Sequence, residues 1–225
     1  MTSLTPPFDM LVFSKTAGYR HESIPAGIKA LKKFAASTGH ITCHATEDAS
    51  AINPENLARY HVLVFLHTSG AFLDEKQLAA LKDYIHLGGG FVGIHGASAG
   101  MPGDEWYEKL IGAAFTYHPK PQDGVIKVES TEDGLTKGLP AEWKWHDEWY
   151  NFRRNPRHNV EVLLSIDEKC YEGGSMGNDH PLAWYQEFEG GRSFYTALGH
   201  FSDAWDDVTF HLHVIKGIYW AAEAF

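Results

Sequence analysis

The chain has 225 residues, a length typical of one α/β domain, and its 19 basic and 29 acidic residues give a net charge of −10 with histidine neutral. This charge excludes nucleic acid and anionic membranes as primary partners, because both are polyanions. With two cysteines, no signal peptide and no apolar run of about 18 residues, the sequence indicates a cytosolic protein that forms a single domain over residues 1–225.

The first half of the chain alternates between strand-like and helix-like patterns. Four apolar runs are typical of buried parallel strands: residues 8–14, 41–45, 61–67 and 91–95. One helix is predicted from a Ser23 cap to Gly39. A second is predicted from an Asp74 cap, with Gln77 as its capping-box partner, to Gly88. Strands separated by helices form right-handed βαβ units, so we predict an α/β fold with a doubly wound, mostly parallel sheet.

The second half is less regular and is expected to add mainly β-structure. Five segments alternate or cluster as strands do: residues 125–129, 145–150, 160–165, 182–188 and 193–198. The last two are predicted to pair as a hairpin around residues 189–191. Apolar residues that recur every four positions predict a C-terminal helix closing over the sheet: Phe210, Val214, Ile218 and Ala222.

Histidines follow three of the predicted parallel strands. His21 lies in the loop after the first strand, and His67 and His95 are the last residues of the third and fourth. Ligands of open parallel sheets bind beyond the carboxyl ends of the strands, where the strand order reverses. We therefore expect the three histidines to meet at one edge, although local hydrogen bonding would also account for one or two of them.

Residues 88–97, GGGFVGIHGA, are typical of a nucleophile elbow, a strained strand-to-helix turn that presents a reactive side chain. Flanking glycines allow close approach of backbones, and the N–H groups of such a turn can hold an anion. The usual occupant is Cys or Ser, whereas here it is His95, so an acyl-thiol or acyl-serine mechanism is not available there. Ser98 is either a helix cap or a nucleophile, and we favour the cap.

Six short segments follow one another in an order typical of one family: KTAGYRH at 15–21, GGGFVGIHG at 88–96, FTYHP at 115–119, DEWY at 147–150, PLAW at 181–184 and GH at 199–200. Together they resemble the ThuA-like (trehalose utilisation) family over nearly the whole chain. The resemblance implies a class I glutamine amidotransferase-like, flavodoxin-like three-layer sandwich with extra β-hairpins. It also implies a role in the catabolism of trehalose, related disaccharides and 3-keto glycosides.

Glutamine hydrolysis is not expected from this resemblance. In the related amidotransferases a Cys stands at the position of His95, and a His-x-Glu pair completes the triad. Here His200 is followed by Phe201 and Ser202.

The family fold would bring His118, Glu148 and His200 near the three strand-end histidines. His118 precedes Pro119, which favours an extended backbone and suits a loop side chain directed at a pocket, although a bond to the backbone is equally plausible. Asp147 and Glu148 are adjacent, so in a strand they face opposite ways. We choose Glu148 for the site, with Asp147 as its orienting partner or a surface residue. Surface positions, or core positions with satisfied hydrogen bonds, are expected for the remaining histidines considered: His146, His158, His211 and His213.

A cluster of histidines and a carboxylate supports two chemistries. The imidazoles of His21, His95 and His118 could hold zinc or a similar divalent metal with one open position, although the chain has no HExxH-type signature. Alternatively, His95, Glu148 and His118 act as catalytic acid and base. On a 3-keto sugar they would remove the proton beside the ketone and eliminate the glycosidic oxygen.

Substrate contacts are predicted from the same loops: Lys15, Tyr19, Arg20, His21, His67, Asp147, Trp184 and His200. The first loop could instead hold a phosphate through Lys15, Thr16 and Arg20, although it lacks GxxxxGK[ST] spacing. Aromatic residues in or beside the loops could stack on pyranose faces, and we expect about two of the five to do so: Tyr19, Trp106, Tyr117, Trp149 and Trp184.

The leading hypothesis is a carbohydrate-processing hydrolase or lyase that acts on a small sugar, either a disaccharide or a keto-glycoside. One alternative is a non-catalytic sugar-binding or regulatory protein descended from an amidotransferase-like ancestor. Another is a metal-dependent hydrolase of an unrelated substrate. Exposed aromatic residues make a homodimer conceivable.

Overall fold

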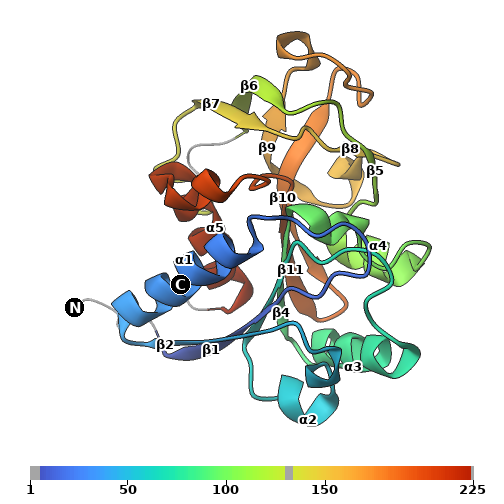
Figure 1. The fold of residues 1–225 in the computed structure, drawn as a ribbon, viewed down its shortest axis with the longest axis vertical. Helices are drawn as coiled ribbons and strands as arrows, with labels where there is room; N and C mark the ends of the chain where they lie inside the picture. The colour runs from blue at the N-terminus through green and yellow to red at the C-terminus, as the bar shows by residue number, and fades with distance from the viewer. Residues whose placement is uncertain (1–5, 130–133, 224–225) are drawn as a thin grey trace.

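A nine-stranded mixed sheet forms the centre of the molecule (Figure 1), and the computed structural model describes residues 6–129 and 134–223. The strands lie in the order β2 (Ile41–Thr46), β1 (Phe8–Phe13), β3 (Val62–Leu66), β4 (Gly90–Ile94), β11 (Gly191–Thr196), β10 (His180–Phe188), β9 (Glu161–Ile166), β6 (Gln122–Val128) and β7 (Glu142–Asp147). Neighbours from β2 to β11 are parallel, and neighbours from β11 to β7 are antiparallel.

Helices cover both faces of the parallel half of the sheet. On one side lie α1 (Ile24–Thr38) and α5 (Val208–Ala221), and on the other lie α3 (Glu75–His86) and α4 (Glu105–Ile111) (Figure 1). The short α2 (Pro54–Leu57) packs beside α3, and β5 (Phe115–Tyr117) pairs with β8 (Asn151–Phe152). Short 3₁₀ segments complete the fold: η1 (Ala49–Ala51), η2 (His95–Ala99), η3 (Pro156–His158), η4 (Glu168–Cys170) and η5 (Ser202–Asp206). The predicted α/β class, with helices on both faces of the sheet, is confirmed.

Local sequence signals account for most of these elements. Strands β3 and β4 are buried along their whole length, as expected of apolar runs covered on both faces. In α3 the predicted capping box is present: the Asp74 carboxylate accepts from the Gln77 backbone, and the Gln77 side chain accepts from the Asp74 backbone. The predicted hairpin joins β10 to β11 through Glu189 and Gly190, whose φ angles of 48° and 97° are those that a tight two-residue turn requires.

Two local predictions are wrong. The strand expected over residues 145–150 ends at Asp147, because the Asp147 carboxylate binds backbone N–H groups of Glu148, Gly199 and His200 and the chain turns there. Ser23 precedes α1 but makes no side-chain cap. Its hydroxyl lies 3.2 Å from Nε2 of the buried His67 instead. Both errors arise from contacts between residues that are distant in the sequence.

The topology places four loops at one edge of the sheet. The chain runs from β1 outward to β2 and then crosses back to β3 on the other side of β1, so the strand order reverses between β1 and β3. Strands β1, β3, β4 and β11 are consecutive parallel neighbours, and their carboxyl ends open at the same edge. Within residues 6–129 and 134–223, no helix is long and apolar enough to cross a membrane.

Replacement of Gly112 by Ala should destabilise the fold more than the same change at Gly103. Both glycines have positive φ angles, 99° and 89°, at which an L-residue costs about 1–2 kcal/mol. A Cβ at Gly112 would also lie 2.4 Å from Nε1 of Trp184, whereas at Gly103 it would meet no atom within 4 Å. We expect the free energy of unfolding, measured in urea, to fall by about 1 kcal/mol more for Gly112→Ala than for Gly103→Ala. Equal losses would contradict this contact.

Candidate functional site

A cavity of about 500 Å³ opens at the carboxyl edge of the parallel strands. Its wall includes aromatic and ionisable side chains from the loop after β1, from β5 and the segment that follows it, and from the segment that follows β7. These residues are Tyr19, His21, Phe115, His118, Glu148 and Tyr150. The cavity therefore lies where an open parallel sheet normally binds its ligand.

The histidines that follow β1, β3 and β4 lie together, with His21 at this wall and with His67 and His95 behind it. The ring centroid of His21 is 4.6 Å from that of His67 and 4.8 Å from that of His95, and the His67 and His95 centroids are 5.2 Å apart. His67 and His95 are fully buried, and both have the left-handed φ angles, 53° and 48°, that strain a side-chain-bearing residue. At His95, β4 passes directly into η2, which is the sharp turn that the glycine-rich pattern predicts.

Glu148 joins these histidines to two others. Its Oε2 lies 3.4 Å from His95 Nε2 and 3.0 Å from His200 Nδ1. Its Oε1 lies 3.5 Å from Nε2 of His118, on the cavity side. One carboxylate therefore contacts three imidazoles, which come from η2, from the loop after β11 and from the segment after β5.

Backbone carbonyls fix the orientation of two of these rings. His95 Nδ1 donates to the Ala197 carbonyl at 2.5 Å, and His118 Nδ1 donates to the Pro119 carbonyl at 2.8 Å. A carbonyl can only accept, so Nδ1 carries the hydrogen in both rings. The Nε2 atoms of His95 and His118 are therefore the ones that face Glu148.

Burial and neighbouring charge have opposite effects on the pKa values of Glu148 and His200. Burial alone would raise the pKa of Glu148, but the contacts with His200 and His95 outweigh it and hold this pKa well below its usual range. Burial would lower the pKa of His200, but the Glu148 carboxylate outweighs it and raises this pKa. The contact between the two side chains therefore shifts their pKa values in opposite directions.

His21 and His67 are neutral imidazoles. Burial, together with the nearby rings of His95 and His200, lowers the pKa of His21 to about 3. Burial and the rings of His95 and His21 hold the pKa of His67 well below its usual range. Their ring nitrogens are thus available as lone-pair donors at neutral pH.

Asp147 holds the loop that carries His200. Its side chain is fully buried and accepts from the backbone N–H groups of Glu148 at 2.9 Å, Gly199 at 2.8 Å and His200 at 3.2 Å, and from Trp145 Nε1 at 2.8 Å. Asp147 is therefore not the surface residue that one alternative expected. It positions both Glu148 and His200 and does not line the cavity.

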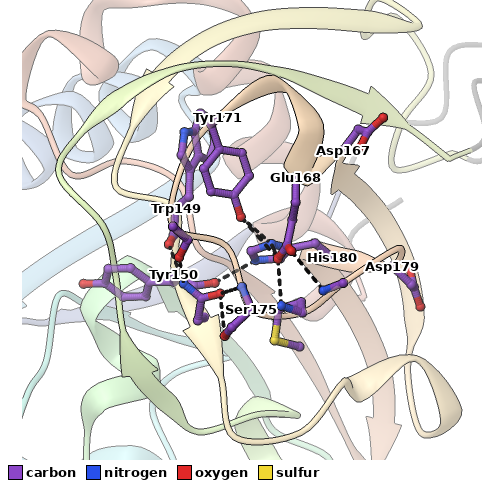
Figure 2. Close-up of polar contacts among 12 residues, drawn as sticks. Trp149, Tyr150, Asp167, Glu168, Tyr171, Ser175, Asp179 and His180 are labelled. Carbon is purple, nitrogen blue, oxygen red and sulfur yellow. Dashed lines mark hydrogen bonds and ion pairs between the residues drawn. The ribbon is translucent and has the colours of Figure 1, made fainter.

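A second polar network fixes the Tyr150 wall of the cavity (Figure 2). The Tyr150 ring lies on the His95 ring, with centroids 4.1 Å apart, and the Tyr150 carbonyl accepts from His180 Nε2 at 2.8 Å. His180 Nδ1 lies 3.0 Å from Glu168 Oε1 and 2.8 Å from the Tyr171 hydroxyl. The Glu168 carboxylate also accepts from the backbone N–H of Met176 at 2.7 Å. Buried contacts thus anchor the segment that carries Glu148 and Tyr150 on both sides.

Several predicted substrate contacts lie elsewhere. Arg20 is exposed and forms a two-bond ion pair with Glu47 at 2.7 and 2.9 Å, so its charge is already compensated. Lys15 is half-buried near Asp48 and is not part of the cavity wall. Trp184 is buried in the core, where Nε1 donates to the Ile111 carbonyl at 2.7 Å, so direct contact with a ligand in the cavity is not available to it.

The aromatic residues of the cavity differ from those expected. Among the five candidates, Tyr19 lines it and is 66% exposed. Trp149 is buried, Trp106 donates to Glu189, and the Tyr117 hydroxyl donates to the Gly173 carbonyl. Sequence reasoning missed Phe115 and Tyr150, although both belong to the segments FTYHP and DEWY that carried the family resemblance.

Ser98 is neither a helix cap nor an accessible nucleophile. It lies inside η2, is buried, donates to the His95 carbonyl at 3.4 Å and accepts from the Tyr195 hydroxyl at 2.8 Å. His146 is exposed beside Asp123, away from the site as expected. His213 is also away from the site, but it is buried in the core without the hydrogen-bond partner that a satisfied core position requires, among the residues that the structure describes.

The family model described as ThuA, trehalose utilisation, matches residues 9–221. The chain belongs to the ThuA family. A crystal structure of a ThuA-like protein from Bacteroides uniformis is 27% identical, with a TM-score of 0.82 over 98% of this chain and 94% of that one. A ThuA-like protein from Parabacteroides merdae is 20% identical, with a TM-score of 0.80 over 96% and 90% of the two chains.

The same fold occurs within a larger enzyme. A β-galactosidase from Bacillus circulans matches 95% of this chain with 32% of its own length, at 12% identity and a TM-score of 0.58, which shows a shared fold alone. No curated protein matches the chain in sequence. Membership of the ThuA family supports a role in sugar metabolism for this protein.

The change Asp147→Asn tests the role of the buried carboxylate in this ThuA protein. An amide N–H₂ in place of one acceptor oxygen leaves buried N–H donors unpaired, which should cost roughly 1–3 kcal/mol of unfolding free energy. Asp123→Asn is the control, because the side chain of Asp123 is 93% exposed and its pair with His146 should change stability by about 0.5 kcal/mol or less. Denaturant unfolding measures both variants, and similar values for the two would refute the role of Asp147.

His213 should make the ThuA fold sensitive to acid. Burial lowers the pKa of His213 to about 3 from 6.5, and neither ring nitrogen has a hydrogen-bond partner among the residues that the structure describes. Between these two pH values the unfolded chain binds the extra proton, so the contribution of this group to stability falls as the pH decreases. When the pH is lowered from 7.5 to 5, the free energy of unfolding measured in urea should fall by about 2 kcal/mol less for His213→Leu than for the unchanged protein. An unaltered pH slope in His213→Leu would contradict this, and His146→Leu is the exposed control.

Proposed function

We propose that this ThuA-family protein binds a sugar in the 500 Å³ cavity and processes it by proton transfer through Glu148 and His118, as a hydrolase or lyase of a disaccharide or 3-keto glycoside. The observation that carries the proposal is the position of the Glu148 carboxylate. One oxygen contacts His95 and His200, and the other contacts His118 at the cavity wall.

The cavity suits a neutral sugar better than an anionic one. Tyr19, Phe115 and Tyr150 provide aromatic surface for the apolar face of a pyranose ring, and His118 and Glu148 provide polar contacts for its hydroxyl groups. The net charge of −10 and the pairing of Arg20 with Glu47 both disfavour a phosphorylated ligand.

On a 3-keto glycoside, the carbon between the ketone and the anomeric carbon carries an acidic proton. In the Glu148 and His118 pair, Nε2 of His118 accepts this proton beside the Glu148 carboxylate, the electrons of the broken C–H bond form a double bond to the anomeric carbon, and the bond to the glycosidic oxygen breaks. The pair then returns one proton to the leaving oxygen, so that no proton is gained or lost. His118 suits this exchange, because its side chain is 33% exposed.

We assign His95 a role other than that of the catalytic acid or base that the sequence suggests. It is fully buried behind Tyr150 and is absent from the cavity wall, so it cannot touch a sugar there. It is therefore a positioning residue that orients Glu148. The cytosol remains the expected location, and both cysteines, Cys43 and Cys170, are free thiols.

Replacement of Glu148 by Gln and of His118 by Gln tests the proposed function. A screen of disaccharides and their 3-keto derivatives, with products identified by mass, first defines a substrate. Each variant should then lower kcat/KM by about 100-fold or more, since positioned acid and base groups contribute about 10²–10⁴-fold. His146→Gln, an exposed histidine outside the site, should leave kcat/KM unchanged.

Two results would refute this assignment. Full activity of Glu148→Gln and His118→Gln would exclude proton transfer by this pair. Sugar binding in calorimetry, with no product from any member of the screen, would instead favour the non-catalytic sugar-binding alternative.

A further inference from the structure

Four potential metal ligands converge beneath the cavity. One ligand atom each of His21, His95, Glu148 and His200 lies within 4.8 Å of the other three. Ligands bound to zinc at about 2.0–2.1 Å in a tetrahedron are about 3.3 Å apart. The distance from Glu148 Oε2 to His95 Nε2, 3.4 Å, already has this value, and that to His200 Nδ1, 3.0 Å, is close to it.

The orientation of His95 is that of a metal ligand. Metal-bound histidines almost always donate their second ring N–H to a carbonyl or carboxylate, which fixes the tautomer and directs the lone pair of the other nitrogen at the ion. His95 Nδ1 donates to the Ala197 carbonyl at 2.5 Å, and Nε2 faces Glu148. The strained backbone of His95, with φ at 48°, holds the ring in this place.

His21 provides an independent observation. Its side chain is buried, with the residue 4% exposed, yet its Nδ1 has no hydrogen-bond partner in the part of the chain that the structure describes. A buried polar nitrogen without a partner costs free energy and calls for an explanation. His67 lies against the same ring at 4.6 Å, but it is outside the group of converging ligand atoms.

We propose that His21, His95, His200 and Glu148 bind one divalent transition-metal ion of the zinc class. Three imidazoles and one carboxylate are ligands that suit zinc and its neighbours, whereas calcium and magnesium prefer oxygen ligands alone. This set revises the ligands expected from the sequence. His118 lies outside the group and contacts the other carboxylate oxygen, and Glu148 and His200 enter it.

The ion would face the substrate. His21 and Glu148 both line the cavity, so a metal held between them can expand its coordination toward a sugar oxygen and polarise it. This role of the metal rests on the proposed function, but metal binding itself requires no sugar.

Calorimetric titration of the chelator-treated, full-length protein with ZnCl₂ at pH 7.5 tests the site. We expect one ion per chain with a dissociation constant on the order of 1 μM or lower. His95→Ala and His200→Ala should each weaken binding at least about 100-fold, because even partners behind a ligand contribute 10–100-fold. His146→Ala should bind as the unchanged protein does.

Cobalt provides a second measurement that does not depend on sugar turnover. Co²⁺ bound by four protein ligands should give a visible absorption band, which His200→Ala should abolish. Because His200 is partly exposed, this variant should still unfold cooperatively on heating.

The proposed metal site would be refuted if the protein bound clearly less than one zinc ion per chain. Equal zinc affinity in His95→Ala, His200→Ala and the unchanged protein would also refute it. Titration decides the metal proposal and product formation decides the proposed function, so each can fail alone. Sugar turnover by metal-free protein that binds no zinc would leave only the proton-transfer proposal. Stoichiometric zinc binding without turnover would leave only the metal site.

Discussion

The contact between the Glu148 carboxylate and the imidazoles of His95, His118 and His200 is the interaction on which the rest of the site depends. A buried carboxylate is costly unless it is paired, and a buried cluster of histidines is costly unless its rings are neutral or compensated. Here the two requirements satisfy each other. The carboxylate raises the pKa of His200, whereas burial lowers the pKa values of His21 and His67.

The parallel sheet provides the spacing that this cluster needs. One histidine follows each of four consecutive parallel strands: His21 after β1, His67 after β3, His95 after β4 and His200 after β11. Adjacent strands lie about 4.7–4.9 Å apart, and the ring centroids of neighbouring histidines in the cluster are 4.6 to 5.4 Å apart. The antiparallel half of the sheet supplies Glu148 at the end of β7, and buried Asp147 connects this end to the His200 loop.

Sequence reasoning predicts what is periodic or local and misses what depends on distant partners. The apolar runs and capping signals predict the parallel strands and α3. The positions where these strands end then predict that His21, His67 and His95 meet at one edge of the sheet. The end of β7 could not be predicted, because Asp147 ends the strand by binding backbone groups about 50 residues away. The buried position of Trp184 likewise depends on its hydrogen bond to the Ile111 carbonyl. The position of Tyr150 in the cavity wall depends on the hydrogen bond from His180 to its carbonyl.

The occupant of the strained turn after β4 decides which chemistry the fold can support. The amidotransferases that the sequence resembles carry a Cys at this position, whereas in this chain the turn holds an imidazole that is fully buried beneath Tyr150. An imidazole there cannot attack a substrate, but its two nitrogens connect the Ala197 carbonyl to the Glu148 carboxylate. A His at this position therefore supports the charged cluster instead of presenting a nucleophile, and under the proposed function Glu148 would be the group that faces the substrate. The turn would then support general acid–base or metal chemistry without a covalent intermediate on the protein.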